Sequence, residues 1–305
     1  MTRAAVVSTL TATHSLPESL RDFQTLVNGG RAGVRLVGDS DPDLTDGERL
    51  HAAHCATWAR FCNAMESARF ERRSGYAWTI CPPVPIPSFN SVWPEDDAAA
   101  SALEGALSEI AAAALPYSLH ARRGKTPAWE EEAERLGLMV RDEEPAMLVT
   151  ADELGEVDVP EVEIVQVKTA DGLAQALAVS ADGFGVPPDL FAPLYDLELL
   201  ELDGLAYYLG RVGDTDVTTG TAFTVGNAVG ILSVATPLQH RGRGYGAAVT
   251  SQAVREGFRA GAEFAWLHSS PSGYPVYHRL GFRTVERYVL YAAPEAAPEA
   301  PDARV

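Results

Sequence analysis

The sequence predicts an α+β fold in which a mixed, mainly antiparallel sheet flanked by helices is built twice. Three observations lead to this prediction. Residues 162–292 read as strand, two helices, three strands, helix, strand, helix and strand, which is not the strict alternation of a parallel sheet. The N-terminal half closes with a similar order of elements. A short repeat links the two halves, and 305 residues suffice for about two domains.

The C-terminal half supplies most of the expected elements. Apolar runs predict strands at 162–167, 205–212, 217–225, 228–235, 263–268 and 283–291. Helices are expected near 171–179 and 189–200, from about 245 to 260, and over 274–280. Gly261 follows the third of these helices, in a position that is typical of helix C-termini.

The N-terminal half is predicted to begin with a strand at 33–37. Thr45 and Glu48 then form a T-x-x-E capping box, which opens a helix running to about Ala68. Further strands are expected at 76–81, 117–120 and near Pro145, and further helices over 98–114 and 129–136. We therefore predict domains at 1–150 and 162–293, a polar linker at 151–161, and a disordered, Pro/Ala/Glu-rich tail at 294–305.

The composition limits the possible partners. The chain has 42 Asp plus Glu against 24 Lys plus Arg, a net charge of −18 that repels nucleic acid and anionic membranes and attracts a cationic acceptor. Its three cysteines do not resemble a disulfide framework, which favours a reducing, cytoplasmic location. We expect no signal peptide and no membrane helix. The oligomeric state stays open.

The repeat is short but falls among matching elements. Leu-His at 119–120 is followed by AERLGL at 133–138, and Leu-His at 267–268 is followed by YHRLGF at 277–282. In each half, a small helix ends in Arg-Leu-Gly and leads into a strand. The repeat therefore favours a duplicated fold.

The most informative segment is RGRGYG, at residues 241–246, between an expected strand and an expected helix. Glycines let the backbone turn tightly and bring N–H groups close to a ligand. Several such donors at a helix N-terminus form an anion site, and Arg241 and Arg243 add charge that a diphosphate would accept. The loop therefore indicates a phosphate-binding site.

This loop resembles the R/Q-x-x-G-x-G/A pyrophosphate loop of the GNAT superfamily of acyl-CoA N-acyltransferases. A second family motif, Tyr-x-x-x-Gly-Phe, is matched at residues 277–282, and the resemblance covers about 162–292. It implies an N-acetyltransferase that moves the acetyl group of acetyl-CoA to a small-molecule or peptide amine, by direct attack in a ternary complex. It implies no metal.

The resemblance also implies individual roles. Tyr277 matches the tyrosine that protonates the departing thiolate, and a phenol suits this task because its pKa near ~10 is close to that of a thiol. The strand Leu232, Ser233 and Val234 is expected to pair with the pantetheine arm. The positions expected to bind acetyl-CoA are Leu232, Ser233, Val234, Arg241, Gly242, Arg243, Gly244, Tyr245, Gly246 and Ala247.

The chain departs from the family pattern in two places. The strand AVGILSVA carries no glutamate to act as general base, so His268, Glu198 and Glu201 are left as candidates and the base is unassigned. In the N-terminal half, FNSVWPEDDAAA has no glycine-arginine loop, and Ala133 replaces the tyrosine. We therefore expect the first domain to be a degenerate GNAT-like domain without a cofactor.

Other interpretations are weaker. Gly242-x-Gly244-x-x-Ala247 fits a dinucleotide fingerprint, but six residues separate it from the preceding strand. His51, His54, Cys55 and Cys62 match no zinc spacing, and the cysteines follow a helical apolar stripe. A non-catalytic acyl-CoA sensor on the same fold remains the alternative function, and Tyr277 argues against it because a sensor needs no proton donor at the sulfur.

Overall fold

The computed structural model describes residues 44–294. Its first half contains helices α2 (Asp46–Cys62), α3 (Leu103–Ala112) and α4 (Pro127–Arg135), the short helices η2 (Pro87–Phe89) and η3 (Asp97–Ala102), and strands β1 (Arg69–Arg73), β2 (Tyr76–Ile80), β3 (Ser91–Pro94), β4 (Ser118–Arg122) and β5 (Met139–Thr150). The predicted strand at 33–37 and most of the predicted tail lie outside the described residues.

The second half contains strands β6 (Glu163–Gln166), β7 (Leu205–Val212), β8 (Thr215–Val225), β9 (Ala228–Ala235), β10 (Phe264–His268) and β11 (Arg283–Ala292). Its helices are α5 (Ala170–Phe184), α6 (Pro188–Phe191), η4 (Ala192–Tyr195), α7 (Leu197–Leu200), η5 (Leu238–His240), α8 (Tyr245–Arg259) and α9 (Tyr274–Arg279). The predicted α+β class is confirmed. Most neighbouring strands are antiparallel, and the parallel pairs are β3–β4 and β9–β10.

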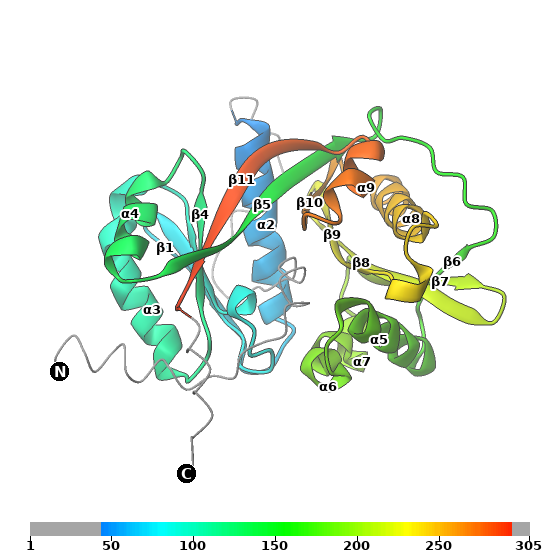
Figure 1. Cartoon of the computed structure of the whole chain (residues 1–305), viewed down its shortest axis with the longest axis horizontal. Helices are drawn as coiled ribbons and strands as arrows, with labels where there is room; N and C mark the ends of the chain where they lie inside the picture. The colour runs from blue at the N-terminus through cyan, green and yellow to red at the C-terminus, as the bar shows by residue number, and fades with distance from the viewer. Residues whose placement is uncertain (1–43, 295–305) are drawn as a thin grey trace, which may run out of the picture.

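The described strands form one continuous sheet in the order β1-β2-β3-β4-β11-β5-β10-β9-β8-β7-β6. The last strand of each half lies inside the sheet of the other half. β5 pairs with β10, and β11 pairs with β4, while β5 and β11 pair with each other. In Figure 1 these two long strands run side by side through the middle of the molecule. Each half therefore completes the sheet of its partner half, and the division into separate domains near residue 150 stays a prediction.

Helices cover both faces of this sheet. One core cluster joins α2 and α5 to strands of both halves, through residues such as Trp58, Leu148, Trp266 and Tyr288. On the opposite face, α3 and α4 cover the first half, whereas α8 and α9 cover the second. On the α2 face one hydrophobic core is therefore shared by both halves, whereas on the opposite face each half of the sheet has its own core.

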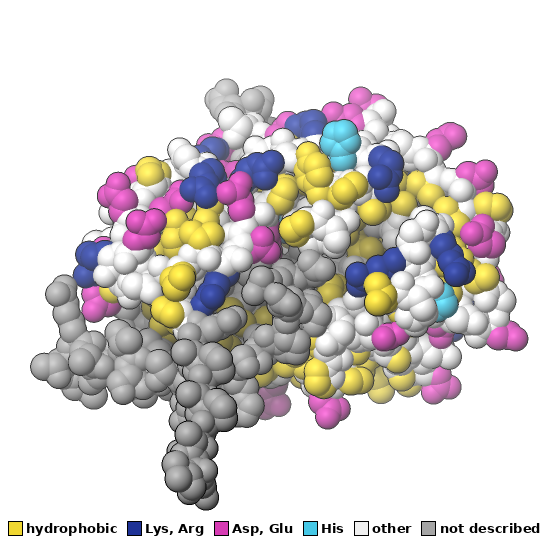
Figure 2. All heavy atoms as spheres, in the orientation of Figure 1, with side chains coloured by type: hydrophobic (Ala, Val, Ile, Leu, Met, Phe, Trp, Pro, Cys, Tyr) yellow, Lys and Arg dark blue, Asp and Glu magenta, His cyan; other side chains and the backbone are white. Residues whose placement is uncertain are grey.

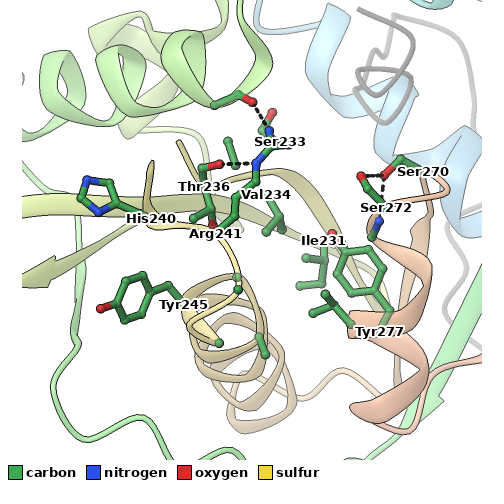
Figure 3. Close-up of a pocket in the computed structure, with 18 of the residues that line it drawn as sticks. Ile231, Ser233, Val234, Thr236, His240, Arg241, Tyr245, Ser270, Ser272 and Tyr277 are labelled. Carbon is green, nitrogen blue, oxygen red and sulfur yellow. Dashed lines mark hydrogen bonds between the residues drawn. The ribbon is translucent and has the colours of Figure 1, made fainter. Parts of the chain in front are cut away.

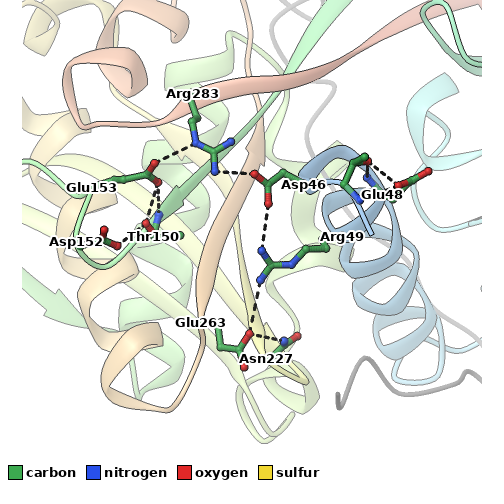
Figure 4. Close-up of polar contacts among 10 residues, drawn as sticks. Asp46, Glu48, Arg49, Thr150, Asp152, Glu153, Asn227, Glu263 and Arg283 are labelled. Atoms are coloured by element: carbon green, nitrogen blue, oxygen red, sulfur yellow. Dashed lines mark hydrogen bonds and ion pairs between the residues drawn. The ribbon is translucent and has the colours of Figure 1, made fainter. Parts of the chain in front are cut away.

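Ion pairs join the start of α2 to the second half, as Figure 4 shows. Asp46 lies 2.8 Å from the Arg283 guanidinium, which also contacts Glu153 at 3.1 Å. Arg49 lies 3.6 Å from Glu263 and over the ring of Phe264, at 4.7 Å from its centroid. The capping box of Thr45 and Glu48 that the sequence predicts is present. The N-terminus of α2 is thus attached to the half that carries the anion-binding motif.

Several expected elements differ from those in the structure. The single helix predicted over 98–114 is the short helix η3 followed by α3. The helix predicted to reach Ala68 ends at Cys62, where the Asn63 side chain donates to the carbonyl of Ala59. The helix expected near 189–200 is broken into α6, η4 and α7, and Asp196 caps the last of these. The strand near Pro145 is longer than its apolar run, because β5 continues to pair with β11 as far as Met139, beyond the point where its pairing with β10 ends at Ala146.

Candidate active site

The site forms where two parallel strands separate. β9 and β10 are paired only at their first residues, Ala228 to Gly230 with Phe264 to Trp266. Beyond these residues the strands diverge and leave a cavity of about 320 Å³. The cavity is lined by Gly183, Phe184, Ile231, Ser233, Val234, Ala235, Thr236, His240, Arg241, Gly242, Gly244, Tyr245, Gly246, Ala247, His268, Ser270, Ser272, Gly273, Val276, Tyr277 and Arg279. Backbone groups of β9 that are released from the sheet are thus exposed to a ligand-sized space.

A β-bulge shapes the β9 wall of this cavity. The pairing between β8 and β9 shifts register between Thr219 and Thr221, so β9 carries one extra residue there. Ser233, at the bulge, has the left-handed backbone angle φ of 48°. Bulges redirect the backbone and side chains of a strand. This bulge turns Ser233 and Val234 to the cavity, while Leu232 is buried in the core on the α2 face.

The glycine-rich loop forms one end of the cavity, beside the start of α8 (Figure 3). Gly242 and Gly244 have φ angles of 77° and 84°, which glycine adopts with little steric cost. Within residues 44–294, no acceptor faces the backbone N–H groups of Gly242 to Ala247. Amides at the N-terminus of a long helix are suited to bind a phosphate group.

The two arginines of the loop behave differently. The Arg241 guanidinium donates to the carbonyl of Thr236 at 2.9 Å and to that of Gly183 at 2.7 Å. Arg241 therefore ties the loop to the C-terminal end of α5, and its charge lies at the cavity wall. Arg243 is exposed and lies outside the lining.

Tyr277 lies at the end of the cavity opposite the loop, as Figure 3 shows. Its ring packs edge-on against Phe282, with 6.0 Å between the centroids, and its hydroxyl has no hydrogen-bond partner in the described part of the chain. Burial raises the pKa of the Tyr277 phenol, so the group stays protonated at physiological pH. A Cβ at Gly273 would lie 2.8 Å from this ring, so Gly273 makes room for it.

Gly281 of the Tyr-x-x-x-Gly-Phe motif has a structural function. Its φ of 93° is left-handed, and a side chain there would collide with the backbone carbonyl of Glu153. Gly281 thus lets the chain turn from α9 into β11 and directs Phe282 against Tyr277. The motif therefore combines a packing requirement with one functional group, the Tyr277 hydroxyl, at the cavity.

Among the three candidate bases, His268 is the one that lines the cavity. It ends β10, where its ring faces Glu144 of β5. Glu198 and Glu201 are exposed at α7 and lie outside the cavity lining. Phe184, Ser270 and Val276 also line the cavity, although the loop and tyrosine motifs do not predict them. Phe184 and Ser270 lie at or just after the end of an element, which is a weak sequence signal, and Val276 lies inside α9.

The corresponding place in the first half is filled. The Arg-Leu-Gly alignment pairs Trp129 with Gly273, and Trp129 is fully buried among residues such as Val92, Leu119 and Ala133. Its indole N–H donates to the Asp96 carbonyl at 2.8 Å. A side chain therefore occupies the place that is open in the second half.

Carboxylates also occupy the amide donors that a phosphate would need in the first half. Asp96 accepts from the Ala98 N–H at 2.9 Å, and Asp97 accepts from the Ala128 N–H at 2.8 Å. These acids lie just after β3, between that strand and the helices η3 and α3, whereas the glycine-rich loop lies between β9 and α8. The first amides of η3 and α4 are thus bound by carboxylates of the protein itself.

Two of the four α2 residues His51, His54, Cys55 and Cys62 lie in a polar cluster inside the core. His51, Cys55 and Glu95 offer ligand atoms within 4.8 Å of one another. Glu95, however, is in an ion pair with Arg72 at 2.5 Å, and the His51 Nδ1 lies 2.7 Å from the Tyr288 hydroxyl. A guanidinium at this place opposes a metal cation, so the cluster fits core packing better than a metal site.

Comparisons with known proteins give matches in structure alone. No family model matches the sequence, and no curated protein matches it. A GCN5-related N-acetyltransferase from Kribbella flavida has 21% sequence identity and a TM-score of 0.60, over 75% of this chain and 91% of that one. A GCN5-related N-acetyltransferase from Sphaerobacter thermophilus has 13% identity and a TM-score of 0.55, over 92% and 98%.

A third match has two domains of this kind. The tandem GNAT protein from the clavulanic acid biosynthesis pathway has 13% identity and a TM-score of 0.52, over 87% of this chain and 98% of that one. The chain therefore has the fold of the GCN5-related N-acetyltransferases, in the tandem arrangement.

Proposed function

We propose that the protein is an N-acetyltransferase that binds one acetyl-CoA in its second half and transfers the acetyl group to a primary amine. The observation that carries the proposal is the cavity between β9 and β10, which has a phosphate-binding loop at one end and Tyr277 at the other. Such a cavity matches a ligand that has a diphosphate at one end and a thioester at the other.

The residues suggest how acetyl-CoA lies in the cavity. The amides of Gly242 to Ala247 would hold the diphosphate. The diverging end of β9, from Ile231 to Val234, would pair with the amides of the pantetheine arm as an added strand. The bulge at Ser233 would then direct a backbone N–H to the thioester carbonyl, where negative charge develops.

Transfer then requires two proton movements. The amine nitrogen attacks the thioester carbon and forms a tetrahedral intermediate. The carbon–sulfur bond breaks as the carbonyl re-forms, and the thiolate takes a proton from the Tyr277 hydroxyl. Since burial raises the pKa of Tyr277, the phenol is present as the acid at neutral pH. The nitrogen must lose a proton to complete the amide.

The acceptor that we propose is a small-molecule or peptide amine. The net charge of −18 favours a cationic acceptor over nucleic acid or an anionic membrane. Basic side chains are scattered among acidic ones on the face shown in Figure 2, with no continuous basic strip among its described residues. Within residues 44–294 no helix has the length and apolar character needed to span a bilayer. Cys55, Cys62 and Cys81 are buried as free thiols, which suits a reducing cytoplasm.

A non-catalytic acyl-CoA sensor is the second candidate, and one observation favours it. β9 carries no carboxylate, although many proteins of the resembled superfamily have their base on this strand. Tyr277 favours the enzyme, because a sensor would not need a proton donor beside the sulfur.

A panel of amines distinguishes the two functions. The full chain is incubated with acetyl-CoA and polyamines, amino acids, aminoglycosides or peptide amines, and free CoA and acetylated products are measured. We expect at least one amine to be acetylated at a rate that depends on the protein. Tight binding of acetyl-CoA without any acetylated product would instead support the sensor.

A further inference from the structure

The missing acid on β9 leaves the proton of the attacking amine without an acceptor. We propose that His268 is the general base and that Glu144, supplied by the first half of the chain, positions it. The proposal rests on the proposed acetyl transfer, and it gives the first half a part in the reaction although acetyl-CoA is placed in the second half.

His268 and Tyr277 border the cavity from opposite faces of the sheet. His268 is two residues beyond Trp266, which belongs to the core on the α2 face. Tyr277 packs against the core on the α8 face. Both line the same cavity, which passes through the gap between β9 and β10. An amine that approaches from the α2 face would therefore meet the imidazole, while the departing sulfur lies toward the phenol.

Glu144 reaches His268 because β5 is exchanged between the halves. β5 pairs with β10 up to Ala146 opposite His268, so Glu144 lies just beyond the end of β10. The Glu144 Oε2 lies 3.5 Å from the His268 Nδ1, and both residues are buried. Because Nδ1 faces Glu144, the atom that takes the amine proton in this proposal is Nε2.

Aromatic rings hold the imidazole in one orientation. His268 stacks on His54 at 4.8 Å and on Tyr288 at 4.7 Å between centroids, with interplanar angles of 9° and 28°. Trp266 contacts its edge at 5.9 Å. A ring held on both sides loses little further freedom when it accepts a proton from a positioned substrate.

The buried surroundings also favour a state in which the Glu144 carboxyl and the His268 imidazole share one titrating proton. Burial raises the pKa of the Glu144 carboxyl well above its usual range, and it lowers the pKa of His268 to about 3. Both shifts oppose net charge, and such a pair titrates as a unit. Loss of the shared proton leaves an imidazole beside a carboxylate, which can take the proton of the amine. Activity should therefore fall as the pH drops and the pair becomes protonated.

Other titratable groups around Glu144 and His268 could also affect the pH at which activity falls. His51 and His54 face it from α2, His120 and Arg122 from β4, Tyr288 and Glu286 from β11, and Asp142 from β5. Burial lowers the pKa of each of the three histidines, so they are neutral at physiological pH, and Arg122 is paired with Glu286 at 3.0 Å. The charge change that matters is thus that of Glu144 and His268.

The test compares the wild-type chain with three variants, using acetyl-CoA and the best amine of the panel. His268→Gln should lower the single-turnover rate by ~10²-fold or more, the scale of a lost general base, with the Kd for acetyl-CoA within about threefold of wild type. Glu144→Gln should lower the rate less and move the acid limb of the pH profile to lower pH. His278→Gln, on the exposed side of α9, should change neither.

Two outcomes would overturn the base assignment. One is a His268→Gln rate within about threefold of wild type, and the other is a Glu144→Gln variant with an unchanged pH profile. An NMR titration of ¹⁵N-histidine-labelled protein with CoA bound gives a readout without turnover. We expect Glu144→Gln to move the pH at which the His268 signals change, and an unmoved signal would refute the coupling. A wild-type chain that acetylates no amine would refute the proposed function instead.

Discussion

Tyr277→Phe should lower the rate of acetyl transfer by ~10²-fold or more, as expected for the loss of a general acid. The substitution removes only the hydroxyl, so the ring still packs against Phe282 and fills the space beside Gly273. The affinity for acetyl-CoA should change little, because the proton is needed in the transition state and not in the ground state. Single-turnover measurements with the best amine would detect the effect even where product release limits kcat.

Tyr274→Phe is the matched control, since Tyr274 lies on the same helix but outside the cavity lining. Its rate should equal that of wild type. If Tyr277→Phe also transferred acetyl within about threefold of wild type, water or another side chain would have to protonate the thiolate.

Gly273→Trp should prevent acetyl-CoA from binding. A Cβ at this position would already lie 2.8 Å from the Tyr277 ring, so an indole must project into the cavity or displace the tyrosine. The first half provides the precedent, because Trp129 fills its equivalent place. We expect the Kd for acetyl-CoA to rise by ~100-fold or more. This corresponds to a loss of about 2.8 kcal/mol of binding free energy, because about 1.4 kcal/mol changes the Kd tenfold.

Calorimetry would measure this loss, and thermal unfolding would show whether the variant is folded. Gly105→Trp is a suitable control, because a Cβ at Gly105 meets no atom within 4 Å and the residue is exposed on α3. That variant should bind acetyl-CoA as wild type does. Undiminished binding by a folded Gly273→Trp protein would contradict the location of the site.

The residues at the two ends of the cavity could be predicted from the sequence. A loop that presents amides to phosphates needs glycines close together along the chain, so Gly242 and Gly244 form a motif that can be recognised in the sequence. Tyr277 is predicted by the resemblance of residues 277–282 to the Tyr-x-x-x-Gly-Phe motif, and in the structure Gly281 turns the chain and Phe282 supports its ring. These expectations agree with the residues that line the cavity, and their roles stay predictions.

Two details of the predicted site depend on geometry that a residue pattern does not carry. A bulge changes which side chains of a strand share a face, so the Leu232 side chain is buried in the core while those of Ser233 and Val234 line the cavity. The expected pairing of their backbone with the pantetheine arm stays a prediction. The Arg241 guanidinium also binds two backbone carbonyls, a contact that the loop motif does not predict, and its charge toward a phosphate stays a prediction. Neither outcome follows from the order of residues in the loop or the strand.

The exchange of β5 and β11 could not be predicted, because the residues of a strand do not specify its partner over such a separation. β5 and β11 are more than 130 residues apart, as their bounds show, and either could have closed the sheet of its own half. For this reason Glu144 was not a candidate before the structure placed it at 3.5 Å from His268. The contribution of the first half to the site is thus a consequence of topology.

The central claim is that the chain has one acetyl-CoA site, between β9 and β10. The most direct test is a calorimetric titration of the full chain with acetyl-CoA, which counts sites without any knowledge of the acceptor. Trp129, Asp96 and Asp97 occupy the corresponding place in the first half, so the stoichiometry should be close to one. A stoichiometry close to two would show that the first half also binds the ligand, and the absence of binding would contradict the site altogether.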